Sequence, residues 1–169
     1  LYSSAASDVY KRQGLESGKE YKDVKSLRYG RVLIMTDQDY DGSHIRGLLI
    51  NLFHELWHTL LQIPGFLAYM ATPIVKATKG KQVKAFYTQY EYEEWKKTSA
   101  SKGWSVKYYK GLGTSTRDEA KEYFKTLNIM PYTYTGKDSD ASIDLAFNKA
   151  KADDRKDWLK TYSLSLIHI

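Results

Sequence analysis

The chain has 169 residues, of which 42% are hydrophobic, so it can form one folded domain of ordinary size and intrinsic disorder is excluded. Its 26 Lys and Arg residues outnumber 20 Asp and Glu residues, and the net charge of +6 makes it moderately basic. Cysteine is absent, which excludes disulfides, thiol nucleophiles and cysteine zinc sites and fits the reducing cytosol or nucleus. No apolar stretch reaches the roughly 18 residues of a membrane helix, so we expect no membrane partner.

The two ends of the chain differ from its middle. Residues 1–13 and 163–169 have no helix caps and no periodicity that continues into their neighbours, and they resemble translated adapter sequence. A targeting peptide is the alternative for the first segment, but that segment lacks an apolar core and contains Asp8. We therefore expect both tails to lie outside the fold and the natural protein to extend further at each end.

Strand and helix patterns alternate between these tails, which predicts an α/β fold. The predicted strands cover 31–36, 69–78, 82–87 and 104–109. The predicted helices cover about 45–60, 88–99, 116–127, 143–151 and 153–160. Two of these helices open with capping boxes, Thr88 with Glu91 and Thr116 with Glu119. The first helix presents one apolar arc, formed by Ile45, Leu48, Leu49, Leu52, Phe53, Leu56 and Leu60.

Three aspartates follow the first predicted strand in the sequence DQDYDG, and we call residues 37–41 the acidic segment. Side chains alternate along extended chain, so Asp37, Asp39 and Asp41 are expected on one side. Three neighbouring carboxylates repel one another unless they share a cation, and all-oxygen ligands favour Mg²⁺. The carboxyl end of a parallel strand is also where open α/β sheets bind ligands.

The acidic segment has two other interpretations. An EF-hand loop starting at Asp37 would need a glutamate at its twelfth position, which is Leu48, and a helix before the loop where a strand is predicted. A simple acidic turn that caps the helix at Ser43 stays open as the alternative.

The sequence HELWH at 54–58 matches the H-E-x-x-H pattern of zinc proteases. His54 and His58 lie on one helix face away from the apolar arc, so we expect them to face solvent or a neighbouring domain. A third ligand would have to be a distant glutamate, and the pattern is short enough to recur by chance. We therefore do not predict a zinc protease.

A glycine-bearing loop, KGLG at 110–113, separates the fourth strand from the next helix. Gly111 and Gly113 allow close approach of the backbone to a partner, and Lys110 offers a charge suited to phosphate. The loop is neither a Walker A nor a Rossmann motif, and an ordinary strand-to-helix turn is the alternative. Arg155 and Lys156 alone are typical of a solvated helix face.

Together, these stretches closely resemble the Toprim region of eukaryotic-type DNA topoisomerase II. The resemblance rests on LRYGRVLIMTDQDYDGSHIRGLLINLFH at 27–54, TPIVKA at 72–77, AFYT at 85–88, EEWK at 93–96, KYYKGLGTSTRDEAKEYF at 107–124 and DDRKDWL at 153–159. It implies a Rossmann-like Toprim domain over 14–130, with a mostly parallel sheet flanked by helices and its N-terminal part missing. Residues 131–162 would be a helical segment leading to a winged-helix domain.

The resemblance also implies an activity: cleavage and religation of double-stranded DNA during strand passage by a nuclear, homodimeric enzyme that uses Mg²⁺ and ATP. Asp37 and Asp39 would be direct metal ligands and Asp41 a ligand through water or a supporting carboxylate. The matching DNA-binding residues are Lys110, Gly111, Gly113, Arg155 and Lys156.

Other parts of such an enzyme are not recognised in this sequence. Glu16 and Glu20 do not match the family's metal-binding glutamate, and the nucleophilic tyrosine and the ATP site belong to other domains. We therefore expect that this segment does not cleave DNA alone. A nucleic-acid-binding domain with a purely structural acidic cluster is one alternative. A Toprim nuclease or primase is the other, and the sequence GLGTST argues against it.

Overall fold

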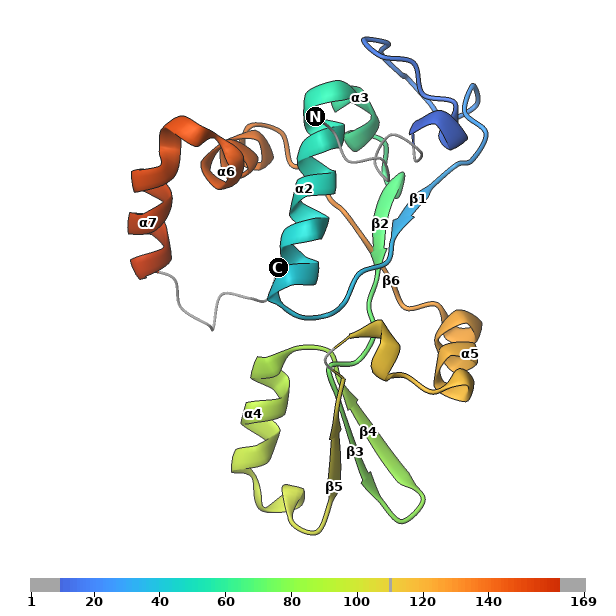
Figure 1. Cartoon of the computed structure of the whole chain (residues 1–169), viewed down its shortest axis with the longest axis vertical. Coiled ribbons are helices and arrows are strands. Elements are labelled where there is room, and N and C mark those ends of the chain that lie inside the picture. Colours follow the sequence, from blue (N-terminus) through green and yellow to red (C-terminus); the bar gives the residue numbers. More distant parts are fainter. Residues whose placement is uncertain (1–9, 110, 162–169) are drawn as a thin grey trace.

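The computed structural model describes residues 10–109 and 111–161, and within them strands and helices form an α/β fold (Figure 1). The strands are β1 (Val32–Ile34), β2 (Leu67–Met70), β3 (Val75–Lys79), β4 (Gln82–Phe86), β5 (Ser105–Tyr108) and β6 (Ile129–Pro131). The α-helices are α2 (Tyr40–Leu56), α3 (His58–Leu61), α4 (Gln89–Lys97), α5 (Arg117–Thr126), α6 (Lys137–Phe147) and α7 (Ala152–Thr161). Three short 3₁₀ helices are η1 (Ser99–Ser101), η2 (Leu112–Thr114) and η3 (Lys149–Lys151). The expected α/β class is confirmed.

The strands form two small sheets, in the orders β1-β2-β6 and β4-β3-β5. Only β1 and β2 pair in parallel among the described strands, with Val32 opposite Leu67, whereas β2 with β6, β3 with β4 and β3 with β5 are antiparallel. The mostly parallel sheet that we expected is therefore not what the described strands form. A tight turn at Gly80, whose φ is +59°, joins β3 to β4, and so short a connection permits only antiparallel pairing.

The predicted strand 69–78 is in fact two strands that belong to different sheets. β2 ends at Met70, β3 begins at Val75, and Pro73 lies between them. Proline has no backbone N–H to donate to a sheet ladder, which explains the break there. The chain thereby passes from the first sheet to the second, which lies at the opposite end of the molecule with α4 against it (Figure 1).

Helix α2 starts five residues earlier than the apolar arc indicated. Ile45 and Leu48 on this arc are 47% and 46% exposed, whereas Phe53 and Leu60 are buried. A helix of 17 residues is about 26 Å long, but a four-residue strand such as β2 spans only about 13 Å, so the first sheet cannot cover every turn. Helix α2 ends at Leu56. The next residue, Trp57, has a non-helical φ of −147° and separates α2 from α3.

Each sheet has its own hydrophobic core. Phe53, Leu60, Phe66 and Leu67 are central to the first core. The second core, between its sheet and α4, consists of Val75, Ala77, Phe86, Tyr92 and Trp95. Both predicted capping boxes are confirmed at the starts of α4 and α5. Each sheet thus packs on its own core. The acidic segment follows β1 of the first sheet, and the KGLG loop follows β5 of the second sheet.

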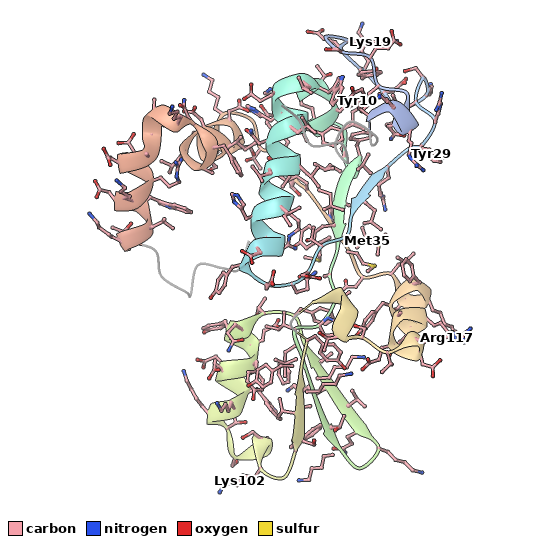
Figure 2. All side chains as sticks on the ribbon, viewed as in Figure 1. Tyr10, Lys19, Tyr29, Met35, Lys102 and Arg117 are labelled. Carbon is pink, nitrogen blue, oxygen red and sulfur yellow. The ribbon has the colours of Figure 1, made fainter. Side chains whose placement is uncertain are left out.

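The segment before β1 also packs on the first core. Residues 10–13 form a helical turn in which Gln13 is buried and donates from Nε2 to the carbonyl of Tyr29 at 2.8 Å. The Tyr10 and Trp57 rings lie 5.8 Å apart, and Figure 2 shows Tyr10 and Tyr29 at this end of the molecule. Residues 10–13 are therefore part of the fold, contrary to our exclusion of 1–13. Residues 1–9 and 162–169 lie outside the described residues, so the adapter origin of the two tails, 1–13 and 163–169, stays a prediction.

None of the described helices is both long enough and apolar enough to cross a membrane.

Candidate metal and nucleic-acid site

Asp39 is the N-cap of α2. Its Oδ1 accepts a hydrogen bond from the backbone N–H of Gly42 at 2.8 Å, and its carbonyl accepts from the backbone N–H of Ser43 at 3.0 Å. The first bond satisfies a helix donor that has no backbone partner within the helix, and the second is the first backbone bond of the helix itself. The helix cap is therefore Asp39, four residues before the cap at Ser43 that the sequence left as an alternative, and it places the Asp39 carboxylate at the positive end of a long helix.

Asp37 lies where two glycines approach it closely. A Cβ on Gly42 would lie 1.9 Å from the Asp37 carbonyl oxygen, and a Cβ on Gly111 would lie 2.8 Å from its Oδ2. Position 42 therefore requires glycine for space, whereas a methyl group at position 111 would have to displace the Asp37 carboxylate. Gly111 belongs to the KGLG loop, so the structure brings that loop against the half-buried Asp37 carboxylate.

Asp41 differs from our geometric expectation. It lies in the first turn of α2 and is exposed, so the extended chain that would align it with Asp37 and Asp39 ends before it. The three carboxylates do not form a group whose oxygens all lie within 4.8 Å of one another, as judged on the described residues. The argument from strand alternation is therefore wrong for Asp41, because Asp39 caps the helix and Asp41 already lies in its first turn.

The donor set still fits Mg²⁺. All three side chains offer carboxylate oxygens, and neither histidine nor cysteine lies among them. Only Oδ1 of Asp39 is used in the helix cap, which leaves its other oxygen for a cation. Mg²⁺ commonly keeps several waters and takes only one or two carboxylates from the protein, so it does not need all three oxygens in direct contact.

Glu119 holds together the two ends of the KGLG loop. Its carboxylate accepts from Lys107 Nζ at 3.1 Å and from the Tyr109 hydroxyl, both before the loop. It also accepts from the backbone N–H of Thr116 after the loop, at 2.7 Å. Sequence reasoning identified Glu119 only as a capping residue, and nothing local indicated its contacts with Lys107 and Tyr109. Lys110 lies outside the described residues.

The pKa of Glu119 reflects these contacts. Burial acts to raise it, but hydrogen bonds from Thr116, Tyr109 and Lys107 prevail and lower the pKa to about 2. Burial and the hydrogen bond to Glu119 also raise the pKa of Tyr109, which keeps its hydroxyl protonated as a donor. The loop is thus fixed at both ends by one ionised carboxylate.

We expect Glu119→Gln to lower the free energy of unfolding by about 2 kcal/mol at pH 7, with allowance for solvent screening. Because the folded pKa is depressed, this stabilisation is present above the ordinary pKa of 4.5 and is lost as the pH falls towards 2. Urea unfolding between pH 7 and pH 2.5 measures the difference. Glu122→Gln is the matched control, since exposed Glu122 pairs with Lys76 at 3.4 Å and should change stability by less than about 1 kcal/mol. Equal losses in both variants would contradict the assignment.

The two basic residues on α7 have different environments. Arg155 Nη1 donates to the carbonyl of Leu145 at 2.7 Å, at the C-terminal end of α6, so its guanidinium is partly engaged within the protein. Lys156 is exposed and pairs with Asp153 at 2.8 Å. Lys156 is therefore the more available of the two for phosphate, while Arg155 also fixes α7 to α6. Their predicted DNA contacts stay predictions.

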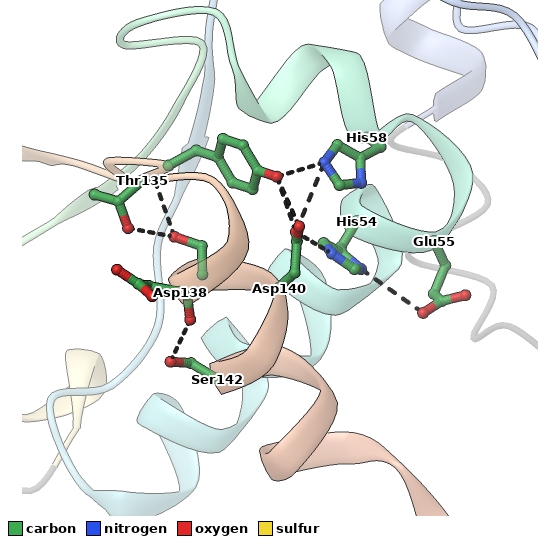
Figure 3. Close-up of polar contacts among 9 residues, drawn as sticks. His54, Glu55, His58, Thr135, Asp138, Asp140 and Ser142 are labelled. Carbon is green, nitrogen blue, oxygen red and sulfur yellow. Dashed lines mark hydrogen bonds and ion pairs between the residues drawn. The ribbon is translucent and has the colours of Figure 1, made fainter.

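A polar cluster joins the C-terminal part of α2 to α6 (Figure 3). His54 Nε2 donates to Asp140 Oδ1 at 2.9 Å, and His58 Nε2 shares a hydrogen bond of 2.8 Å with the Tyr134 hydroxyl. The His54 side chain is only 16% exposed. Our expectation that the histidines face solvent or a neighbouring domain is wrong for His54, which α6 of the same chain covers, whereas the His58 side chain is 38% exposed. The hydrogen bond from His54 lowers the pKa of Asp140, so this carboxyl is ionised.

Comparison with known proteins bears on all these residues. Residues 70–167 match the family described as the C-terminal associated domain of TOPRIM. DNA topoisomerase 2 of Arabidopsis thaliana is 53% identical over 155 residues, which cover 88% of this chain and 10% of that protein. DNA topoisomerase 2-beta of Gallus gallus is 52% identical over 168 residues, which cover 96% of this chain and 10% of that protein.

One solved structure gives the same result. The crystal structure of the Plasmodium falciparum topoisomerase II DNA-binding, cleavage and re-ligation domain matches with a TM-score of 0.87 and 46% identity, over 96% of this chain and 23% of that chain. The expected resemblance to eukaryotic DNA topoisomerase II is confirmed. The chain spans about a tenth of the length of the curated relatives.

Proposed function

Because this chain belongs to the family of C-terminal associated domains of TOPRIM, we propose that it is a segment of a type II DNA topoisomerase. In this proposal the segment supplies the Mg²⁺-binding acidic segment for cleavage and religation of double-stranded DNA. The identities of about 50% to relatives named DNA topoisomerase 2 support the topoisomerase assignment.

The observation that carries the proposal is the contact between the KGLG loop and Asp37. A Cβ on Gly111 would lie 2.8 Å from Oδ2 and 3.0 Å from Cγ of Asp37. The backbone of a loop suited to phosphate therefore lies against the carboxylate suited to Mg²⁺. A DNA phosphate that contacted the loop would lie beside the acidic segment, where a bare carboxylate alone would repel it.

Each residue then has a distinct role. Asp37 and Asp39 are the proposed direct ligands, and Asp41, on the first turn of α2, acts through water. Mg²⁺ bound there would reverse the local charge and stabilise negative oxygens at the scissile phosphate. Gly111 and Gly113 let the backbone approach that phosphate, and Lys110 adds a positive charge.

Further parts of the proposal concern the whole protein. The enzyme would be a nuclear homodimer that couples strand passage to ATP bound outside this segment. Arg155 and Lys156 would contact DNA from α7. The segment alone would not cleave DNA, because no tyrosine in it matches the nucleophile of the family.

The substitution Gly111→Ala, made in the intact enzyme that contains this chain, tests the contact between the KGLG loop and Asp37. The added methyl group must displace the Asp37 carboxylate, which can move as a side chain without unfolding the domain. We expect Mg²⁺-dependent DNA cleavage to fall about tenfold to a hundredfold, since a misplacement of about 1 Å has effects of that size. The rate of cleavage of a supercoiled plasmid, measured over a Mg²⁺ titration, gives the result.

Gly30→Ala is the matched control. A Cβ on Gly30 would meet only Val24 Cγ2 at 3.9 Å, an ordinary contact, so cleavage should stay within about twofold. If Gly111→Ala cleaved DNA as fast as the unchanged enzyme, the loop would not be part of the site. A DNA-binding domain with a purely structural acidic segment would then describe the chain better.

A further inference from the structure

The polar cluster between α2 and α6 brings three metal-ligating side chains together. These are His54, His58 and Asp140, and one ligand atom from each lies within 4.8 Å of the others. Asp140 Oδ1 is 2.9 Å from His54 Nε2 and 3.7 Å from His58 Nε2. In a tetrahedral zinc site with bonds of about 2.0–2.1 Å, neighbouring ligand atoms are about 3.4 Å apart. The two measured distances lie on either side of that value.

We propose that His54, His58 and Asp140 bind a zinc ion that fastens α6 to α2. This site is separate from the acidic segment, and it does not depend on the proposed topoisomerase function. The ion would have three protein ligands, with water in the fourth position: His54 near the end of α2, His58 at the start of α3 and Asp140 in the first turn of α6.

The ligand types select the metal. Two imidazoles with one carboxylate suit zinc and related transition metals, whereas Mg²⁺ prefers oxygen ligands. Although Trp57 separates α2 from α3, the ring centres of His54 and His58 are only 4.7 Å apart. The charges also balance, because the two positive charges of zinc would meet the carboxylates of Asp140 and the adjacent Glu55.

The second ring nitrogen of His54 supports the proposal independently. His54 Nδ1 is buried and has no hydrogen-bond partner, but Glu55 Oε1 lies 3.8 Å away. Zinc on Nε2 needs the lone pair there, so the ring proton must move to Nδ1. That N–H could then donate to Glu55 after a small side-chain movement, which is the carboxylate support that zinc-bound histidines commonly have.

Tyr134 would support the third ligand. Its hydroxyl donates towards Asp140, 2.9 Å from Oδ1 and 3.0 Å from Oδ2. With zinc on Oδ1, the bond to Oδ2 can remain and orient the carboxylate. Glu55 lies beside His54 Nδ1, so it is placed to support that histidine and not to activate a zinc-bound water molecule.

The position of the site gives it a mechanical role. At the far end of α6, Phe147 packs against α2, where a Cβ on Gly47 would lie 2.8 Å from the ring. Phe147 also lies 6.3 Å from the ring of His44. Zinc at Asp140 would fix the other end of α6, and only the short helix η3 separates α6 from α7. The ion would thus hold the last two helices of the described chain in place.

Zinc binding by the metal-free chain tests the proposal, in competition with a chromophoric chelator and with millimolar Mg²⁺ present to occupy the acidic segment. We expect one equivalent of zinc to bind and His58→Ala or Asp140→Asn to weaken its affinity at least tenfold. Co²⁺ should give the strong visible absorption of a four-coordinate site, and His58→Ala should remove it. Zinc should also raise the unfolding temperature of the unchanged chain but not of His58→Ala.

Two control variants match these changes. Asp138→Asn alters a neighbouring exposed aspartate on α6, and His44→Ala removes the exposed histidine of α2, so both should keep the zinc affinity within about twofold. His58 is 38% exposed, so its replacement does not disturb a core. If the unchanged chain bound no zinc, or if His58→Ala and Asp140→Asn bound it as tightly as the controls, the cluster would be only a hydrogen-bonded helix junction.

Discussion

Asp37→Ala in the intact enzyme that contains this chain is expected to reduce Mg²⁺-dependent DNA cleavage by about a thousandfold. Asp37 is the half-buried carboxylate against the KGLG loop, so its removal takes away the proposed ligand closest to the phosphate. A bound divalent ion contributes several kcal/mol to stabilising transition-state charge, and about 4 kcal/mol corresponds to a factor of a thousand. Religation of a nicked or cleaved substrate should fall in parallel, because both directions share one metal site.

Asp41→Ala should have a smaller effect, about tenfold, because Asp41 lies on the exposed first turn of α2 and acts through water. Asp23→Ala is the control for removing a carboxylate elsewhere. Among the described residues its side chain pairs only with Lys25, accepting from the backbone N–H at 2.9 Å and lying 3.9 Å from Nζ, so cleavage should be unchanged within about twofold.

Metal binding by the chain gives a readout that does not depend on catalysis. Calorimetric titration with Mg²⁺ should show weaker binding for Asp37→Asn than for the unchanged chain. If Asp37→Asn bound the ion equally well, or if Asp37→Ala cleaved DNA at the normal rate, the acidic segment would not be the metal site.

The sequence predicted best those features that depend on neighbouring residues. Both capping boxes were expected and are present, because each is specified within four residues. The start of α2 was missed, although the Asp39 cap is also local. Because we interpreted all three aspartates as metal ligands on extended chain, we did not predict that Asp39 caps the helix.

Features that depend on distant residues were not predictable in the same way. His54 and Asp140 are 86 residues apart in the chain, and no periodicity on α2 indicates that α6 covers its polar face. Similarly, residues 69–78 were predicted as one strand although Pro73 lies within them, because their division between two sheets depends on the strands with which β3 pairs. Residue chemistry thus identified the candidate ligands, whereas tertiary packing determined which of them meet.

Gly42 links the start of α2 directly to the candidate metal site. Its backbone N–H donates to the Asp39 cap, and its Cα faces the Asp37 carbonyl so closely that a Cβ would lie 1.9 Å from the oxygen and 2.7 Å from the carbon. A backbone carbonyl cannot rotate away as a side chain can, so an added methyl group would force either the helix start or the acidic segment to shift.

We therefore expect Gly42→Ala to lower the free energy of unfolding by about 3 kcal/mol, at the upper end of overpacking effects, even though alanine has the better helix propensity. Urea unfolding of the chain, followed by far-ultraviolet circular dichroism, measures this. Gly113→Ala is the matched control, because no atom lies within 4 Å of the added methyl group, and it should change stability by less than about 1 kcal/mol. If Gly42→Ala were as stable as Gly113→Ala and bound Mg²⁺ normally, the first turn of α2 would not be packed against Asp37.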